Sequence, residues 1–163
     1  MLCMLRYASP LGELKLAAGE KGLRVLVMSG QRYERAHLPS DLPEAETPAL
    51  LMARDWLDAY FAGERPDIGR VPLDPAGTDF QRRVWQALTG IPYGETFSYG
   101  DLARRLGSSA RAVGAAVGRN PISILIPCHR VLGKTGGLTG YAGGLERKVA
   151  LLTLEGAQFR NNG

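Results

Sequence analysis

The string SYGDLARRLGSSARAVGAAVGRN, residues 98–120, contains two short helical segments separated by only a few residues. Ser98 and Asp101 have the spacing of a capping box, which predicts a helix that begins there and ends at Gly107. A second helix is expected from Ala110 onward. Two helices joined by so tight a turn predict a helix-turn-helix.

The second of these helices contains only Ala, Gly and Val between Arg111 and Arg119. Such small side chains let a helix backbone come close to the wall of a nucleic-acid groove or to another helix. The alternative is a helix that is simply packed in the core, and the residues alone do not decide between the two.

The first 30 residues have the pattern of an antiparallel sheet. Three segments, Met4–Ser9, Glu13–Ala18 and Leu23–Met28, are rich in strand formers and are separated by the turn-forming strings SPLG and GEKG. Residues 31–47 are polar and contain two prolines, which indicates a loop or a short irregular helix. Apolar residues at helical spacing then predict a helix over residues 49–62.

The string DPAG at residues 74–77 is a plausible hinge, because the pattern changes to helical from Thr78. We therefore predict an α+β fold with two domains. Residues 1–77 form an N-terminal α/β domain with a hairpin sheet and a helix. Residues 78–163 form a mostly helical domain that contains the helix-turn-helix and the active site, and a last helix is expected over residues 145–154.

The charge is distributed unevenly along the 163 residues, whose formal net charge is +4. Residues 1–77 carry 9 Lys and Arg against 11 Asp and Glu, whereas residues 78–163 carry 11 against 5. A basic half is typical of a protein with a polyanionic partner such as nucleic acid, although a solvated basic face is a common alternative.

Several classes of protein are not expected. No run of about 18 apolar residues predicts a membrane span, and the N-terminus lacks the features of a secretory signal. We expect a soluble cytoplasmic protein. The two cysteines, Cys3 and Cys128, do not suggest a disulfide framework, and no Cys/His cluster has metal-ligand spacing, so we expect no metal and no cofactor.

The apolar run at residues 122–126 is expected to be buried and extended, and it delivers Cys128 next to His129 at a bend fixed by a proline. A thiolate is the nucleophilic form of cysteine, and a neighbouring imidazole backed by a carboxylate can produce it. Glu155 and Asp101 are the candidate carboxylates. The alternative is an inert buried cysteine, which the chemistry alone leaves open.

The string PCHRV at residues 127–131, preceded by RAVG (111–114) and RNP (119–121), strongly resembles the O6-alkylguanine-DNA alkyltransferase family. The match continues through IPYGE (91–95), SY (98–99), TGYAGG (139–144) and LEG (154–156), so it covers residues 78–156 in order. The resemblance implies single-turnover DNA repair, in which an alkyl group moves irreversibly from the O6 atom of guanine in double-stranded DNA to a cysteine. It leaves open whether O4-alkylthymine is also a substrate.

The resemblance also implies a role for each matching residue. The expected catalytic group consists of the alkyl acceptor Cys128, the base His129 acting through a water, Glu155 orienting the imidazole, Asn120 bracing the turn and Tyr99 donating toward guanine N3. The pocket would be lined by Tyr141, Val131 and Ala142. DNA would be contacted after base flipping through the minor groove by Ala110, Arg111, Ala112, Gly114, Ala115, Arg119 and Arg130, with Arg111 entering the base stack. We expect a monomer that needs no protein partner.

Three other functions compete with this one. A non-reactive alkyltransferase-like protein would lack the acceptor cysteine, and Cys128 argues against it. A helix-turn-helix regulator would prefer a DNA sequence rather than a lesion. A cysteine hydrolase would turn over repeatedly, whereas an alkyltransferase would stop after a burst equal to the protein concentration.

Overall fold

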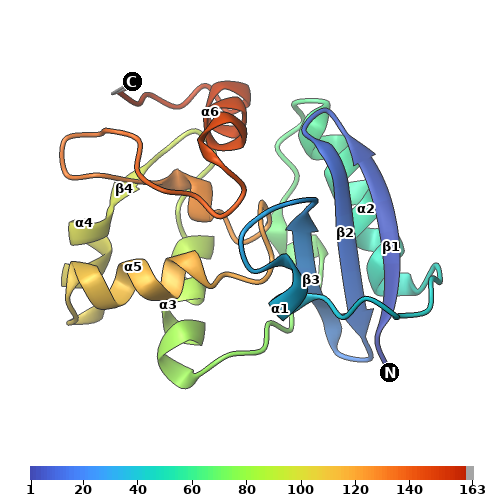
Figure 1. The fold of residues 1–163 in the computed structure, drawn as a ribbon. Helices are drawn as coiled ribbons and strands as arrows, with labels where there is room; N and C mark the ends of the chain where they lie inside the picture. Colours follow the sequence, from blue (N-terminus) through green and yellow to red (C-terminus); the bar gives the residue numbers. More distant parts are fainter. Residues whose placement is uncertain (161–163) are drawn as a thin grey trace. The chain divides into compact units, whose positions relative to one another are not determined.

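The computed structural model describes residues 1–160 and has the α+β fold that the sequence predicts (Figure 1). The chain divides into two compact units. Unit 1 comprises Met1–Ala76 together with Pro121–Ser123, and unit 2 comprises Gly77–Asn120 and the chain from Ile124 onward. No helix within residues 1–160 combines the length and the apolar character that crossing a membrane requires.

Unit 1 is built on an antiparallel sheet of three strands in the order β1-β2-β3, which are Cys3–Ser9, Gly12–Gly19 and Gly22–Met28. The three predicted strands are confirmed. The turn at Gly22 requires glycine, because its φ is +138° and a Cβ there would come within 2.5 Å of the Pro72 carbonyl oxygen.

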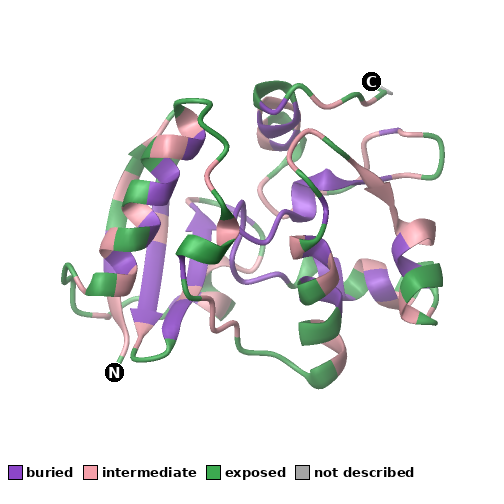
Figure 2. Ribbon diagram, turned by 180° about the vertical axis from the view of Figure 1, so that it is seen from behind, coloured by how far each residue is buried: buried purple, intermediate pink, exposed green. Residues whose placement is uncertain are grey.

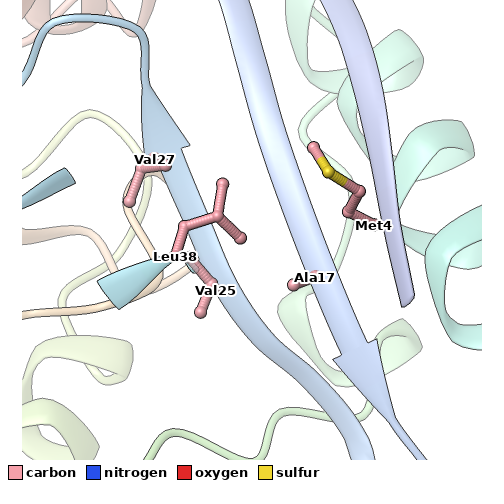
Figure 3. Packing of buried hydrophobic residues seen from close by; sticks show 5 residues of the cluster. All are labelled: Met4, Ala17, Val25, Val27 and Leu38. Atoms are coloured by element: carbon pink, nitrogen blue, oxygen red, sulfur yellow. The ribbon is translucent and has the colours of Figure 1, made fainter. Parts of the chain in front are cut away.

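Helix α2, Pro48–Phe61, contacts all three strands of this sheet, and the Thr47 side chain caps it by accepting from the Leu50 amide. Its buried residues recur at helical spacing, so one side of the helix is buried and the other is exposed, with intermediate residues as well (Figure 2). A further cluster on the sheet, shown in Figure 3, consists of Met4, Ala17, Val25, Val27 and Leu38. Leu38 follows the short helix α1, Glu34–His37.

The two edges of the sheet are covered by short segments of the chain. The Met4 amide donates to the Pro43 carbonyl at the edge of β1. At the edge of β3, Leu26 exchanges backbone hydrogen bonds with Pro121 and Ser123, at 2.9 and 3.0 Å. The 3₁₀ turn η1, Ile68–Arg70, precedes a second covering segment, which pairs with Leu23 of β3. This pairing leaves β3 buried although it is an edge strand of the sheet.

Unit 2 is mostly helical. Its helices are α3 (Asp79–Thr89), α4 (Tyr99–Leu106), α5 (Ala110–Gly118) and α6 (Leu145–Leu154). Two short parallel strands accompany them, β4 (Phe97–Ser98) and β5 (Val131–Leu132).

The predicted helix-turn-helix consists of α4 and α5. A capping box between Ser98 and Asp101 begins α4, and Gly107, with φ +63°, ends it. The Ser109 side chain caps α5 by accepting from the Ala112 amide, 3.1 Å away. The start of each helix is thus capped by a serine side chain, and the end of α4 is formed by a glycine that adopts a positive φ.

The run at residues 122–126 differs from the extended strand that we expected. The run is buried, and in Figure 2 the whole stretch from 120 to 132 has the colour of buried residues. However, it forms a turn in which Ile124 has a φ of +71°. A β-branched residue in this region is strained, so the surrounding contacts impose the turn against the preference of the residue.

Candidate active site

Cys128 lies at the start of the 3₁₀ turn η2, Cys128–Arg130, and is 6 % exposed. The turn begins with the Cys128 amide donating to the Ile126 carbonyl at 2.8 Å. The amide nitrogen of the Asn120 side chain donates to the same carbonyl, also at 2.8 Å. Asn120 therefore ties the end of α5 to the turn that carries the thiol, although the two are separated by a strained loop.

His129 and Glu155 form a buried pair in which the Nε2 and Oε2 atoms lie 2.7 Å apart. Burial would raise the pKa of Glu155, but the hydrogen bonds from His129 and Arg130, together with the Arg130 charge, outweigh it and hold that pKa far below its ordinary value. Glu155 is therefore an ionised acceptor, and Nε2 of His129 must carry the proton between them.

Burial lowers the pKa of His129, although its bond with Glu155 opposes this effect. The imidazole is therefore neutral, with its lone pair on Nδ1. Within residues 1–160 that nitrogen is buried and has no hydrogen-bond partner. A neutral imidazole of this tautomer is a base that can take a proton at Nδ1.

The Cys128 thiol is protonated at rest. Burial raises its pKa, and this effect exceeds the lowering by hydrogen bonds from Asn120 and Tyr141 and by the charge of Lys148. A buried thiol of this kind needs a base to become a nucleophile.

Lys148 is a site residue that the sequence analysis missed. It is fully buried in α6, and its Nζ atom donates to the Val131 carbonyl at 2.7 Å. Burial lowers its pKa to about 8, and the nearby Cys128 opposes that shift. One signal was available, because Lys148 shares the spacing of the buried residues Leu151, Leu152 and Glu155 on the last helix.

Arg130 is not at the surface where a DNA contact was expected. It is 4 % exposed, and its Nε and Nη2 atoms donate to the two oxygens of Glu155 at 2.8 and 3.0 Å. Its Nη1 atom donates to the Ile91 carbonyl at 2.6 Å. The guanidinium is therefore engaged inside the protein, and the predicted DNA contact of Arg130 has no support in this structure.

Asp101, the other candidate carboxylate, caps α4 by accepting from the Ser98 amide at 3.0 Å. Tyr99 lies close enough to Cys128 for the two groups to interact electrostatically, and its hydroxyl accepts from the Thr139 hydroxyl at 3.3 Å. Burial raises the pKa of Tyr99, so the hydroxyl keeps its proton and can donate it to a hydrogen bond.

Of the expected pocket residues, Val131 is buried, whereas Tyr141 and Ala142 are partly exposed.

The remaining expected DNA contacts lie along α5 and just after it. Four of them are exposed (Ala110, Arg111, Ala115 and Arg119), and Ala112 and Gly114 are half-buried. A Cβ on Gly114 would lie 3.7 Å from the Tyr99 ring, so α5 passes beside that tyrosine at Gly114. A groove of about 650 Å³ opens next to them, lined by the start of α4 and the loop at 133–136, with Arg104 and Lys134 among its residues.

Comparison with known proteins identifies close relatives over nearly the whole chain. Residues 79–157 match the 6-O-methylguanine DNA methyltransferase, DNA binding domain, and residues 4–75 match the ribonuclease-like domain of the same family. A methylated-DNA–protein-cysteine methyltransferase of Mycobacterium tuberculosis is 54 % identical over 151 residues, 90 % of this chain and 88 % of that protein. One from Methanosarcina acetivorans is 47 % identical over 154 residues, 93 % and 96 % of the two chains.

Solved structures show the same similarity. The crystal structure of Mycobacterium tuberculosis OGT in complex with DNA is 49 % identical, has a TM-score of 0.82, and is matched over 94 % of this chain and 92 % of that one. An O6-methylguanine-DNA methyltransferase from Pyrococcus kodakaraensis matches with a TM-score of 0.71 at 25 % identity, over 96 % of this chain and all of that one. The fold is therefore retained at much lower sequence identity.

Proposed function

This chain belongs to the 6-O-methylguanine DNA methyltransferase family, and from that membership we propose that it repairs DNA by moving an alkyl group from O6 of guanine to the sulfur of Cys128. Each molecule acts once, because the product is a thioether that mild hydrolysis does not cleave. The observation that carries the assignment of Cys128 is the adjacent His129, whose buried Nε2 atom lies 2.7 Å from Oε2 of the buried Glu155.

The reaction begins with the proton of the thiol. His129 takes that proton at Nδ1, with a water as the carrier, and the resulting imidazolium is stabilised by Glu155. The developing thiolate accepts hydrogen bonds from Asn120 and Tyr141 and is attracted by the charge of Lys148. These three groups oppose the effect of burial, so they favour the charged form at the moment when it is needed.

The thiolate then attacks the alkyl carbon, so a carbon–sulfur bond forms while the bond between that carbon and O6 breaks. The electron pair of the broken bond passes to the purine, which becomes an ordinary guanine by accepting one proton. A hydrogen bond from the Tyr99 hydroxyl toward guanine N3 makes the purine a better leaving group. The proton lost by the thiol balances the one gained by the base.

The substrate is double-stranded DNA that carries O6-alkylguanine. A base within a duplex cannot reach a buried thiol, so the nucleotide must rotate out of the stack into a pocket formed by Tyr141, Val131 and Ala142. The helix α5 suits the minor groove, where Ala110, Ala112, Gly114 and Ala115 permit close approach and the base edges carry little sequence information. Arg111 fills the vacated position in the stack and Arg119 contacts the backbone. We propose that the protein does this as a monomer.

Intact mass spectrometry tests the transfer directly. Mixing the protein with O6-methylguanine DNA should add one methyl group to Cys128, at a ratio that never exceeds one per molecule. Cys128→Ala should abolish the addition and retain DNA binding. Cys3→Ala is the matched control, because it removes the other cysteine of the chain and should leave transfer unchanged. An unmodified Cys128 in protein that demonstrably binds this DNA would refute the proposal.

A second measurement addresses base flipping. Arg111→Ala should slow transfer from a duplex by about one to two orders of magnitude, since unstacking a base costs a few kcal/mol that the inserted side chain partly offsets. Transfer from the free modified base should be almost unaffected, because that substrate needs no extrusion. Equal losses on both substrates would remove Arg111 from this role.

A further inference from the structure

The Nε, Nη1 and Nη2 atoms of Arg130 all donate to buried acceptors. Two of its nitrogens donate to the two oxygens of Glu155, and the third donates to the Ile91 carbonyl. The Tyr93 ring covers the guanidinium, with 5.7 Å between Cζ and the ring centroid. The bidentate contact fixes the plane of the carboxylate as well as its position.

The orientation of that carboxylate decides what His129 can do. Oε2 of Glu155 accepts hydrogen bonds from both Nε2 of His129 and Nη2 of Arg130, so one carboxylate oxygen links the two side chains. The Gly94 amide also donates to the opposite oxygen, Oε1, at 3.4 Å. A carboxylate held from three sides cannot turn to meet the imidazole differently.

The charges around His129 come from two elements, η2 and α6. Arg130 follows it in η2, Lys148 lies in α6, and Glu155 lies at the end of α6, while the thiol of Cys128 precedes it. A buried carboxylate that faced the imidazole alone would favour imidazolium, the form with no free lone pair. A guanidinium on the same carboxylate offsets that attraction.

We propose that Arg130 is a positioning residue which, through Glu155, keeps His129 neutral with its proton on Nε2 and so leaves Nδ1 free to accept the Cys128 proton. This inference rests on the proposed alkyl transfer for its purpose. Its physical content, the protonation state of His129, can be measured without any transfer.

The direction of the electrostatics agrees with this assignment. Burial is the main reason for the low pKa of His129, and the charges of Arg130 and Lys148 lower it further against the opposing bond with Glu155. Removing the Arg130 charge should therefore raise the pKa of His129. A raised pKa leaves the imidazole protonated at neutral pH, and the base recovers only as the pH rises above the new value.

The first experiment is ¹⁵N NMR of the imidazole nitrogens in the whole protein. The chain has only two histidines, so His37 in unit 1 serves as an internal reference. Wild-type His129 should be neutral at pH 7 with its proton on Nε2. In Arg130→Met the His129 signals should move toward imidazolium, and those of His37 should not. A protonated His129, or a proton on Nδ1, in the wild type would overturn the proposal.

The second experiment is the single-turnover rate of methyl transfer across about pH 5 to 9. In Arg130→Met the acid limb should move upward by about one pH unit, which is about a tenfold loss at a pH on that limb, with recovery at alkaline pH. Arg130→Lys keeps a charge without the bidentate geometry, so the shift of the acid limb should be smaller. If the Met variant does not fold, both experiments can be done with Arg130→Lys. Arg54→Met, which removes a surface pair with Glu46, is the matched control and should match the wild type.

The outcomes separate the two hypotheses. A uniform loss of rate at all pH values, with unmoved His129 signals, would show that Arg130 only supports the fold and would overturn the inference. An NMR shift as predicted, in a protein that never accepts a methyl group, would support the role of Arg130 in setting the protonation of His129 and refute the proposed function.

Discussion

The two units bury different kinds of side chain. In unit 1 the buried polar residues are the uncharged Gln31 and Ser123, and its ion pairs, such as Arg6–Glu13 and Lys15–Glu34, keep at least a fifth of each side chain exposed. In unit 2 the buried polar residues are Asn120, His129, Arg130, Lys148 and Glu155. Within residues 1–160, every buried Arg, Lys, His and Glu therefore belongs to unit 2.

This difference means that burial serves stability in unit 1 and the reactivity of the site in unit 2. Apolar burial stabilises unit 1, and its charges cost little because they remain in contact with water. Burying charges in unit 2 carries a desolvation penalty that paired partners only partly return. The penalty has a chemical result, since the same charges set the protonation states of His129 and Cys128. Unit 2 holds its reactive groups at the expense of stability.

The largest effect should come from breaking the buried ion pair. Glu155→Ala leaves Arg130 without its partner, which should cost unit 2 about 3–5 kcal/mol and abolish methyl transfer at neutral pH. Leu57→Ala in unit 1 is the control, because it should cost a similar 2–5 kcal/mol and leave transfer per folded molecule unchanged.

The two tryptophans allow each unit to be followed separately in urea. Trp56 lies in α2 and Trp85 in α3, so a Trp→Phe substitution at one leaves a fluorescent reporter for the other unit. If Glu155→Ala shifted the Trp56 transition as much as the Trp85 transition, the distinction between the units would fail.

A smaller effect should follow from the buried Lys148. Its pKa in the folded protein is about 8, below the value of about 10.4 for an unfolded lysine, so between those values only the unfolded chain holds the proton. The stability of unit 2 should therefore rise with pH across that window, by an amount on the order of a few kcal/mol. Lys148→Met should remove this rise, raise stability at pH 7 by about 1–3 kcal/mol and slow transfer. Urea midpoints at pH 7 and pH 10 measure it, and a wild-type stability that fell over this range would contradict it.

The smallest effect should come from a surface pair. Arg6→Met removes contacts to Glu13 and Glu44, whose side chains are 42 % and 62 % exposed, and should cost unit 1 less than about 1 kcal/mol. The loss should shrink further in high salt, because exposed charges are screened. A loss above that of Leu57→Ala would mean that unit 1 depends on its charges after all.

Local patterns predicted the elements of both units well. Turn formers located β1 to β3, and the Ser98–Asp101 capping box with the stop at Gly107 located α4 and the start of α5, because these features act over a few residues. The resemblance to a family singled out Glu155 rather than Asp101 as the partner of His129, and the two lie in contact. Spacing alone had left both carboxylates open.

Tertiary packing decided what the local patterns did not predict. Arg130 and Lys148 look like ordinary surface cations in the sequence, and only the folded chain surrounds them with carbonyl and carboxylate oxygens. The prediction that residues 122–126 are buried was correct, but the prediction that they are extended was wrong. Asn120 holds the Ile126 carbonyl from outside the run, and Ile124 adopts a positive φ that its own side chain disfavours.

The pairing of β3 with residues 121–123 has a consequence for expressing the N-terminal half of the chain by itself. A fragment that ends at Ala76 would lack three residues of its own unit and would expose the amide and carbonyl of Leu26 that they normally occupy. Unpaired strand edges of this kind promote self-association. Expression of the N-terminal half should therefore succeed better when a peptide with the sequence of 120–124 is grafted behind a linker or supplied in trans.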